Sequence, residues 1–114
     1  MPTRKEIACR ENMASCQGFD KVIAMIGGKW KLWILRILIF GGTKRFNELR
    51  REITGITQTM LTSQLRALEE DELVTRKVYA EVPPRVEYSA TKKAAALEKF
   101  FGEMHKWAVE NVEN

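Results

Sequence analysis

Residues 45–68 decide the fold of this chain, and they read RFNELRREITGITQTMLTSQLRAL. In the first half, Phe46, Leu49 and Ile53 recur at helical spacing, with basic side chains on the opposite face. Thr54-Gly55-Ile56 is a tight turn, and Thr57 is a good N-cap for a second helix. The side chains expected to face inward from that helix are Leu61, Leu65 and Leu68. The stretch therefore predicts a helix-turn-helix over residues 45–71.

The segments on both sides of this motif predict a winged helix. The segment before it is apolar almost all round, which favours a buried central helix. The segments after it are rich in β-branched and aromatic residues, which favours a hairpin. The expected elements are helices at 19–26 and 29–40, strands at 73–79 and 85–89, and one long helix over 91–112 that Thr91 caps. We predict a mainly α (α+β) fold in a single domain, 1–114: an N-terminal segment at 1–18, a two-stranded β wing at 73–89 and a long C-terminal dimerisation helix.

Composition excludes several classes of protein. The 114 residues carry a net charge of +4 and contain no apolar run of the ~20 residues that cross a bilayer, and the N-terminus lacks the apolar stretch of a secretion signal. Two cysteines and one histidine leave a structural zinc site one ligand short. Neither a nucleophile–base pair nor a phosphate-binding glycine loop is present. We expect a cytoplasmic protein that is not an enzyme and needs no metal or cofactor.

Charge is distributed unevenly along the chain. Residues 44–66 hold five Lys and Arg against two Glu, whereas residues 69–72 are all acidic. A polyanion could approach the first region and would be repelled by the second. The acidic block is therefore expected to point away from any bound DNA.

Several motifs recur in the order found in a known family. Between about Cys16 and the C-terminus, the chain resembles HxlR-type bacterial transcriptional regulators, which are similar in fold to the MarR group of dimeric, DNA-binding winged-helix proteins. Two positions depart from the pattern, because Glu72 and Ala94 stand where the family usually has glycine. The segments that carry the resemblance are IGGKWK at 26–31, KRFNEL at 44–49, GITQTMLT at 55–62, LRALEED at 65–71 and PPRVEYS at 83–89.

The second helix of the motif has a small, polar and uncharged start, as a major-groove reader requires. Gln can pair with adenine and Arg with guanine, and a Thr methyl can contact the thymine methyl. Arg66 has an alternative, which is an ion pair with Glu69 or Glu70 one turn further on. The residues expected to face the bases are Thr57, Gln58, Thr59, Thr62, Ser63 and Arg66.

Basic residues around this helix are candidates for contacts with the DNA backbone. Arg85 follows two prolines at the expected tip of the wing, and it is the candidate for a neighbouring minor groove. Arg76 and Lys77 are expected at most to make flanking phosphate contacts. The candidates on the first helix of the motif are Lys44, Arg45, Arg50 and Arg51.

An aromatic stripe on the last helix predicts a homodimer, because one small domain cannot easily bury it. Its expected interface residues are Leu97, Phe100, Phe101, Met104, Trp107 and Ala108. A two-fold dimer predicts a near-palindromic double-stranded operator. The operator sequence and any small-molecule effector stay undetermined.

Cys9 and Cys16 lie among basic residues, which favour a reactive thiolate. Some regulators of the family sense oxidants through a cysteine at the position of Cys16, and an inert thiol is the alternative. We therefore predict a sequence-specific DNA-binding transcriptional regulator with a thiol-redox response as a candidate property. The alternative function is a winged-helix module that binds a protein and has lost its affinity for DNA.

Overall fold

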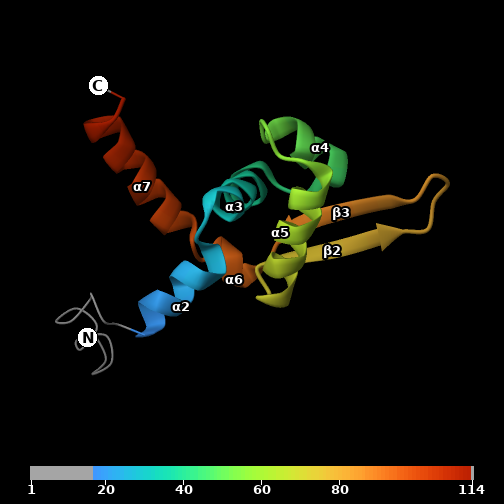
Figure 1. Ribbon diagram of the computed structural model, residues 1–114, viewed down its shortest axis with the longest axis horizontal. Helices are drawn as coiled ribbons and strands as arrows, with labels where there is room; N and C mark the ends of the chain where they lie inside the picture. Colours follow the sequence, from blue (N-terminus) through green and yellow to red (C-terminus); the bar gives the residue numbers. More distant parts are fainter. Residues whose placement is uncertain (1–16, 114) are drawn as a thin grey trace.

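Helix α3 (Lys29–Gly41) lies at the centre of the fold, where it contacts α5, α6, α7 and β3. The computed structural model describes residues 17–113 (Figure 1). Ile34, Leu35 and Leu38 of α3 are buried, as expected of a helix that is apolar almost all round. Gly28 and Gly42 flank the helix with φ of 93° and 81°, a left-handed conformation that glycine adopts without strain.

The helix-turn-helix is confirmed. It consists of α4 (Phe46–Glu52) and α5 (Gln58–Glu70), and helix α2 (Gln17–Ile26) precedes α3. The Met60 N–H donates to Thr57 Oγ1 at 3.1 Å, so Thr57 is the N-cap that the sequence indicates. The inward residues of both helices and of the turn between them join one hydrophobic core: Leu49, Ile53, Ile56, Leu61, Leu65 and Leu68.

The wing contains a third strand that the sequence analysis did not predict. Strands β2 (Val74–Tyr79) and β3 (Arg85–Ala90) form the expected hairpin, and β1 (Lys44–Arg45) adds to the other edge of β3, antiparallel. The assignment of Lys44 and Arg45 to the first helix of the motif is therefore wrong. Lys44 pairs with Tyr88 across the sheet, and α4 begins only at Phe46 because the Arg45 N–H donates to Glu48 Oε1 at 3.0 Å.

Glu72 ends α5 in the left-handed conformation, with φ of 60°. The Glu72 N–H donates to the Glu69 carbonyl at 3.0 Å, and the Leu73 N–H donates to the Leu68 carbonyl at 2.9 Å. These two bonds define a Schellman motif, in which glycine is the usual left-handed residue. Thr91 Oγ1 also donates to the Glu72 carbonyl at 2.7 Å. The turn therefore keeps its shape with glutamate, at a conformational cost of roughly 1–2 kcal/mol.

The C-terminal helix is divided, which corrects the expectation of one helix over 91–112. Helix α6 (Lys92–Ala95) ends after one turn, and α7 (Glu98–Asn111) begins after Leu97. At the break, the Leu97 N–H donates to the carbonyl of Ala94, three residues back, instead of four. The change of direction allows both Ala94 and Phe101 to reach the hydrophobic core.

The molecule has two projecting ends. The hairpin of β2 and β3 extends from one side of the core, and α2 and α7 project from the other (Figure 1). The winged-helix fold class with a C-terminal helix is thus confirmed.

Candidate nucleic-acid interface

The outer face of α5 carries the residues expected to face DNA bases. A shallow groove of about 520 Å³ runs along it, and its lining includes Gln58, Thr59, Thr62, Ser63 and Arg66. Thr62 Oγ1 donates to the carbonyl of Gln58 at 2.9 Å, so this hydroxyl is bonded within the helix. The Thr57 hydroxyl is similarly occupied as the helix cap. The long hydrogen-bond donors that line this face are those of Gln58 and Arg66, and Glu70 also lines it.

A second groove, of about 340 Å³, separates α5 from the wing sheet. It brings Arg66 of α5 and Arg76 of β2 to the same opening, with Tyr88 of β3 in its wall. Burial raises the pKa of the Tyr88 hydroxyl, while the Arg76 guanidinium acts in the opposite direction. The net shift is upward, so Tyr88 is a neutral hydroxyl at physiological pH. This meeting of two arginines was not foreseen from the sequence.

The carboxylates near this face do not neutralise Arg66. Within residues 17–113, no carboxylate lies within 4.0 Å of its guanidinium, so the alternative pairing with Glu69 or Glu70 does not form there. Glu69 nevertheless lines the groove beside the wing, and Glu70 lines the groove on α5. Both residues therefore border the grooves, and the orientation of the acidic block relative to bound DNA stays a prediction.

The basic residues of the motif differ in how available they are. Arg50 and Arg51 are exposed on α4. Lys44, in contrast, is mostly covered, and its Nζ lies 3.5 Å from Glu52 Oε1. An ion pair with its own chain makes Lys44 a weaker candidate for phosphate than the sequence suggested.

Arg85, the candidate for a neighbouring minor groove, is paired within its own hairpin. Its guanidinium lies between the carboxylates of Glu81 and Glu87 and over the ring of Tyr79. Arg76 and Lys77 are exposed on β2, and the Lys77 ammonium lies 4.8 Å from the centre of the Tyr79 ring. The basic residue of the wing that shares a groove with α5 is therefore Arg76, whereas Arg85 lies on the other face of the hairpin.

The predicted dimer stripe divides into exposed and buried parts. Phe100, Met104 and Trp107 are exposed on α7, as an interface requires. Phe101 is buried in the protomer's own core, where its ring meets Phe40 edge-on, so its assignment to the interface is wrong. Leu97 packs against the same core, and Ala108 is half-buried.

Helix α2 adds an apolar face that the sequence analysis did not assign to an interface. Its exposed side chains are Phe19, Val22 and Ile23. Their helical spacing is visible in the sequence, where it indicates an amphipathic helix without assigning its apolar face to an interface. In the structure Ile26 alone of this helix is buried.

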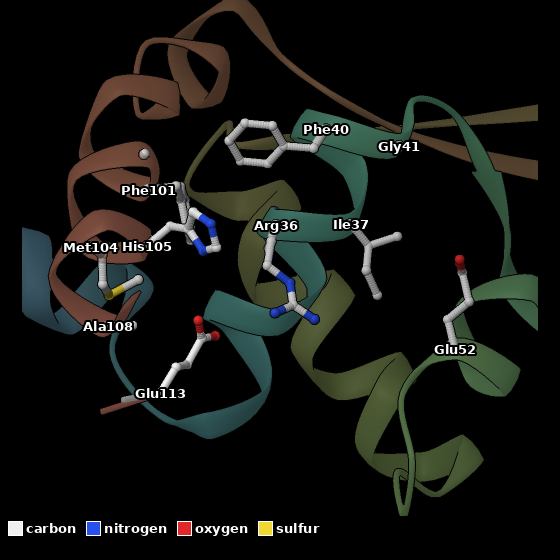
Figure 2. A pocket seen from close by; sticks show the side chains of 11 residues that line it. Arg36, Ile37, Phe40, Gly41, Glu52, Phe101, Met104, His105, Ala108 and Glu113 are labelled. Carbon is white, nitrogen blue, oxygen red and sulfur yellow. The ribbon is translucent and has the colours of Figure 1, made fainter. Parts of the chain in front are cut away.

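A pocket of about 710 Å³ lies between α3 and α7. Phe40, Phe101 and Met104 contribute apolar lining, and the side chains of Arg36 from α3 and His105 from α7 also line the pocket (Figure 2). It adjoins the exposed stripe of α7, and its lining also includes Glu52 of α4.

Three other expectations concern cysteines, metals and membranes. Cys9 and Cys16 lie outside the described residues. Among residues 17–113, no cluster of three His, Cys, Asp or Glu side chains is placed to hold a metal ion. None of the helices in this part of the chain combines the length and the apolar character needed to cross a membrane.

Comparison with known proteins identifies the family. The model of the HxlR-like helix-turn-helix family matches residues 25–114. This chain belongs to that family. The HTH-type transcriptional regulator YybR of Bacillus subtilis is 52% identical over 87 residues, covering 76% of this chain and 69% of YybR. The chain is therefore a helix-turn-helix transcriptional regulator, as expected from the sequence, and the alternative of a protein-binding module is not supported.

Two solved structures resemble the chain closely. The oxidised form of the redox regulator HypR superposes with a TM-score of 0.76 at 46% identity, covering 82% of this chain and 96% of that one. The reduced form of the regulator YodB from B. subtilis gives 0.75 at 37% identity, covering 86% of this chain and 95% of that one. Both likenesses cover more than four fifths of this chain.

Proposed function

We propose that this regulator binds a near-palindromic operator as a homodimer, with α5 in the major groove and the wing against the flanking minor groove. The observation that carries the proposal is the outer face of α5, where Gln58 and Arg66 stand beside a groove shared with Arg76. Polar side chains at the start of a helix can reach base edges, and neighbouring guanidinium groups bind phosphate. The protein acts in the cytoplasm, where it has access to the DNA.

Retention on heparin and a mobility shift on the DNA flanking the chain's own gene test this function. Binding to that DNA should exceed binding to a random duplex and should weaken steeply as salt rises, because counterions are released from the phosphates. Failure to bind any duplex at low salt would overturn the proposal.

The two-fold arrangement constrains the operator. Recognition helices of such dimers contact half-sites about 34 Å apart, which is one turn of the double helix. Exposed apolar faces on α2 and α7 supply surfaces on which a second copy can pack. The operator half-sites are therefore expected to be inverted and separated by whole turns.

Gln58 is the first residue to test in base recognition. Gln58→Ala should cost ~1–3 kcal/mol on the operator and relax the sequence preference, because a bidentate contact to adenine would be lost. Gln64→Ala is the matched control, since Gln64 belongs to the same helix but lines neither groove. Titration of operator and random duplexes by fluorescence anisotropy measures both effects. Equal affinity of Gln58→Ala and wild type for the operator would exclude Gln58 from base reading.

The redox part of the proposal concerns Cys16. Arg10 and Lys21 are near it in the sequence, and nearby bases lower the pKa of a thiol. The structural relative HypR is named a redox regulator, which supports a similar property here. Diamide is expected to change operator affinity in the wild type and not in Cys16→Ser, with non-reducing gels run in parallel. The same response in both proteins would contradict a sensor role for Cys16.

A further inference from the structure

The wing presents two chemically different faces. Side chains alternate along a strand, and the register pairs Tyr79 with Arg85 and Lys77 with Glu87. These four residues therefore share one face of the hairpin. The opposite face carries Arg76 and Tyr88, which are also cross-strand partners and line the groove against α5.

The Arg85 guanidinium is held by three groups of its own hairpin. Its centre lies 3.9 Å from the centroid of the Tyr79 ring, and Nη2 lies 3.3 Å from Glu81 Oε1. Nε lies 3.6 Å from Glu87 Oε2, beyond hydrogen-bond distance, and this buried nitrogen finds no hydrogen-bond partner among the described residues. Glu81, Glu87 and Tyr79 together with Arg85 are called the wing latch below.

The two carboxylates of the wing latch offset the positive charge of Arg85 that could attract DNA to this face of the wing. One guanidinium between two carboxylates leaves a net negative charge at the base of the loop, and Lys77 on the same face only restores neutrality. A duplex that approaches this face meets no net attraction while the latch is closed. The contribution of Arg85 to DNA binding therefore depends on whether its ion pairs with Glu81 and Glu87 stay formed.

We propose that Glu81 competes with a DNA phosphate for the Arg85 guanidinium, and so sets how strongly the wing binds DNA. Glu81 is the partner suited to exchange, because it lies in the loop before β3 and its side chain is 49% exposed, against 23% for Glu87. Exposed ion pairs are weak, whereas a phosphate offers arginine two parallel charge-assisted hydrogen bonds. Tyr79 keeps the guanidinium stacked while the partner changes. The inference rests on the proposed function, since it requires the wing to lie against DNA.

The test is a double-mutant cycle on DNA affinity. Glu81→Gln should tighten binding to operator and random duplexes alike, by about 3–10-fold at low salt, because the competing charge is removed. The same substitution in an Arg85→Ala background should lose most of that gain. Glu103→Gln on α7 removes the same charge far from the wing and should leave affinity unchanged. If Glu81→Gln increased DNA affinity equally with and without Arg85, the gain would come from reduced repulsion between the carboxylate and the DNA, and the proposal would be overturned. A Glu81→Gln variant whose DNA affinity is unchanged or lower than that of the wild type would also overturn it.

A second measurement follows the latch without DNA. The Arg85 Nε–H signal, assigned by nuclear magnetic resonance, should exchange with water faster in Glu81→Gln than in the wild type, and adding duplex to the wild type should shift it. If wild-type protein binds duplex with this signal unmoved, the competition is wrong and the proposed function stands. If the wild type binds no duplex at all, the proposed function fails, whatever the signal shows.

Discussion

Trp107→Glu is expected to turn the dimer into monomers and to reduce operator affinity by ~10²–10⁴-fold. Trp107 is the most exposed ring on α7, at 60%, and Phe100 and Met104 continue the same face. Two-fold symmetry places each substitution in the interface twice, so two carboxylates would be buried where aromatic surface had packed. A monomer contacts one half-site at a time and loses the gain of linked binding.

Val109→Glu is the matched control for this prediction. It introduces the same charge on the same helix, also at an exposed apolar residue, but two positions along a helix correspond to about 200° around its axis. Sedimentation equilibrium should find monomers for Trp107→Glu and dimers for Val109→Glu at the same protomer concentration. Normal dimers of Trp107→Glu with wild-type operator affinity would place the interface elsewhere.

The local features of the fold were predictable from the sequence. Thr57 as a cap, the turn at Gly55 and the inward leucines of α5 depend on residues within a few positions of one another. The glycine that the family usually has at this position is consistent with the left-handed turn that Glu72 adopts, although the sequence left open a different end of the helix. In each case, residues close together in the sequence determine the backbone conformation, through a side-chain cap or a turn residue.

The features that were missed depend on contacts distant in sequence. Strand β1 exists because Lys44 pairs with Tyr88, and two residues carry no periodic pattern of their own. The break before α7 arises because Ala94 and Phe101 both pack into the core, although residues 91–112 alone favour one helix. Local propensity predicts what a segment prefers, and tertiary packing decides where it bends.

The candidate site shows the same division. The exposed start of α5 was identified from residue types, since it needed only the period of one helix. The ion pairs of Arg85 were not predicted from the sequence, because its pairing with Glu81 and Glu87 depends on the register of the hairpin. Arg66 and Arg76 line one groove because α5 packs on the sheet, and no spacing in the sequence encodes that packing.

Arg66→Ala/Arg76→Ala is expected to weaken operator binding by ~100-fold or more, since each charge-assisted contact contributes about 1.5–3 kcal/mol. If both arginines bind phosphate, the slope of log K against log salt should also fall by about 2. Lys99→Ala/Lys106→Ala on α7 removes the same charge away from both grooves and is the control for the general field of the protein.

The single variants then separate two roles within the groove. Loss of a phosphate contact weakens all duplexes about equally, whereas loss of a contact to guanine weakens the operator more than random DNA. Arg76 stands on the wing strand beside Tyr88, so we expect Arg76→Ala to act on both duplexes alike. Arg66 lines both grooves, and a larger loss on the operator in Arg66→Ala would mean that its guanidinium reads a base. Wild-type affinity and salt slope in the double variant would remove the groove between α5 and the wing from the DNA-binding surface.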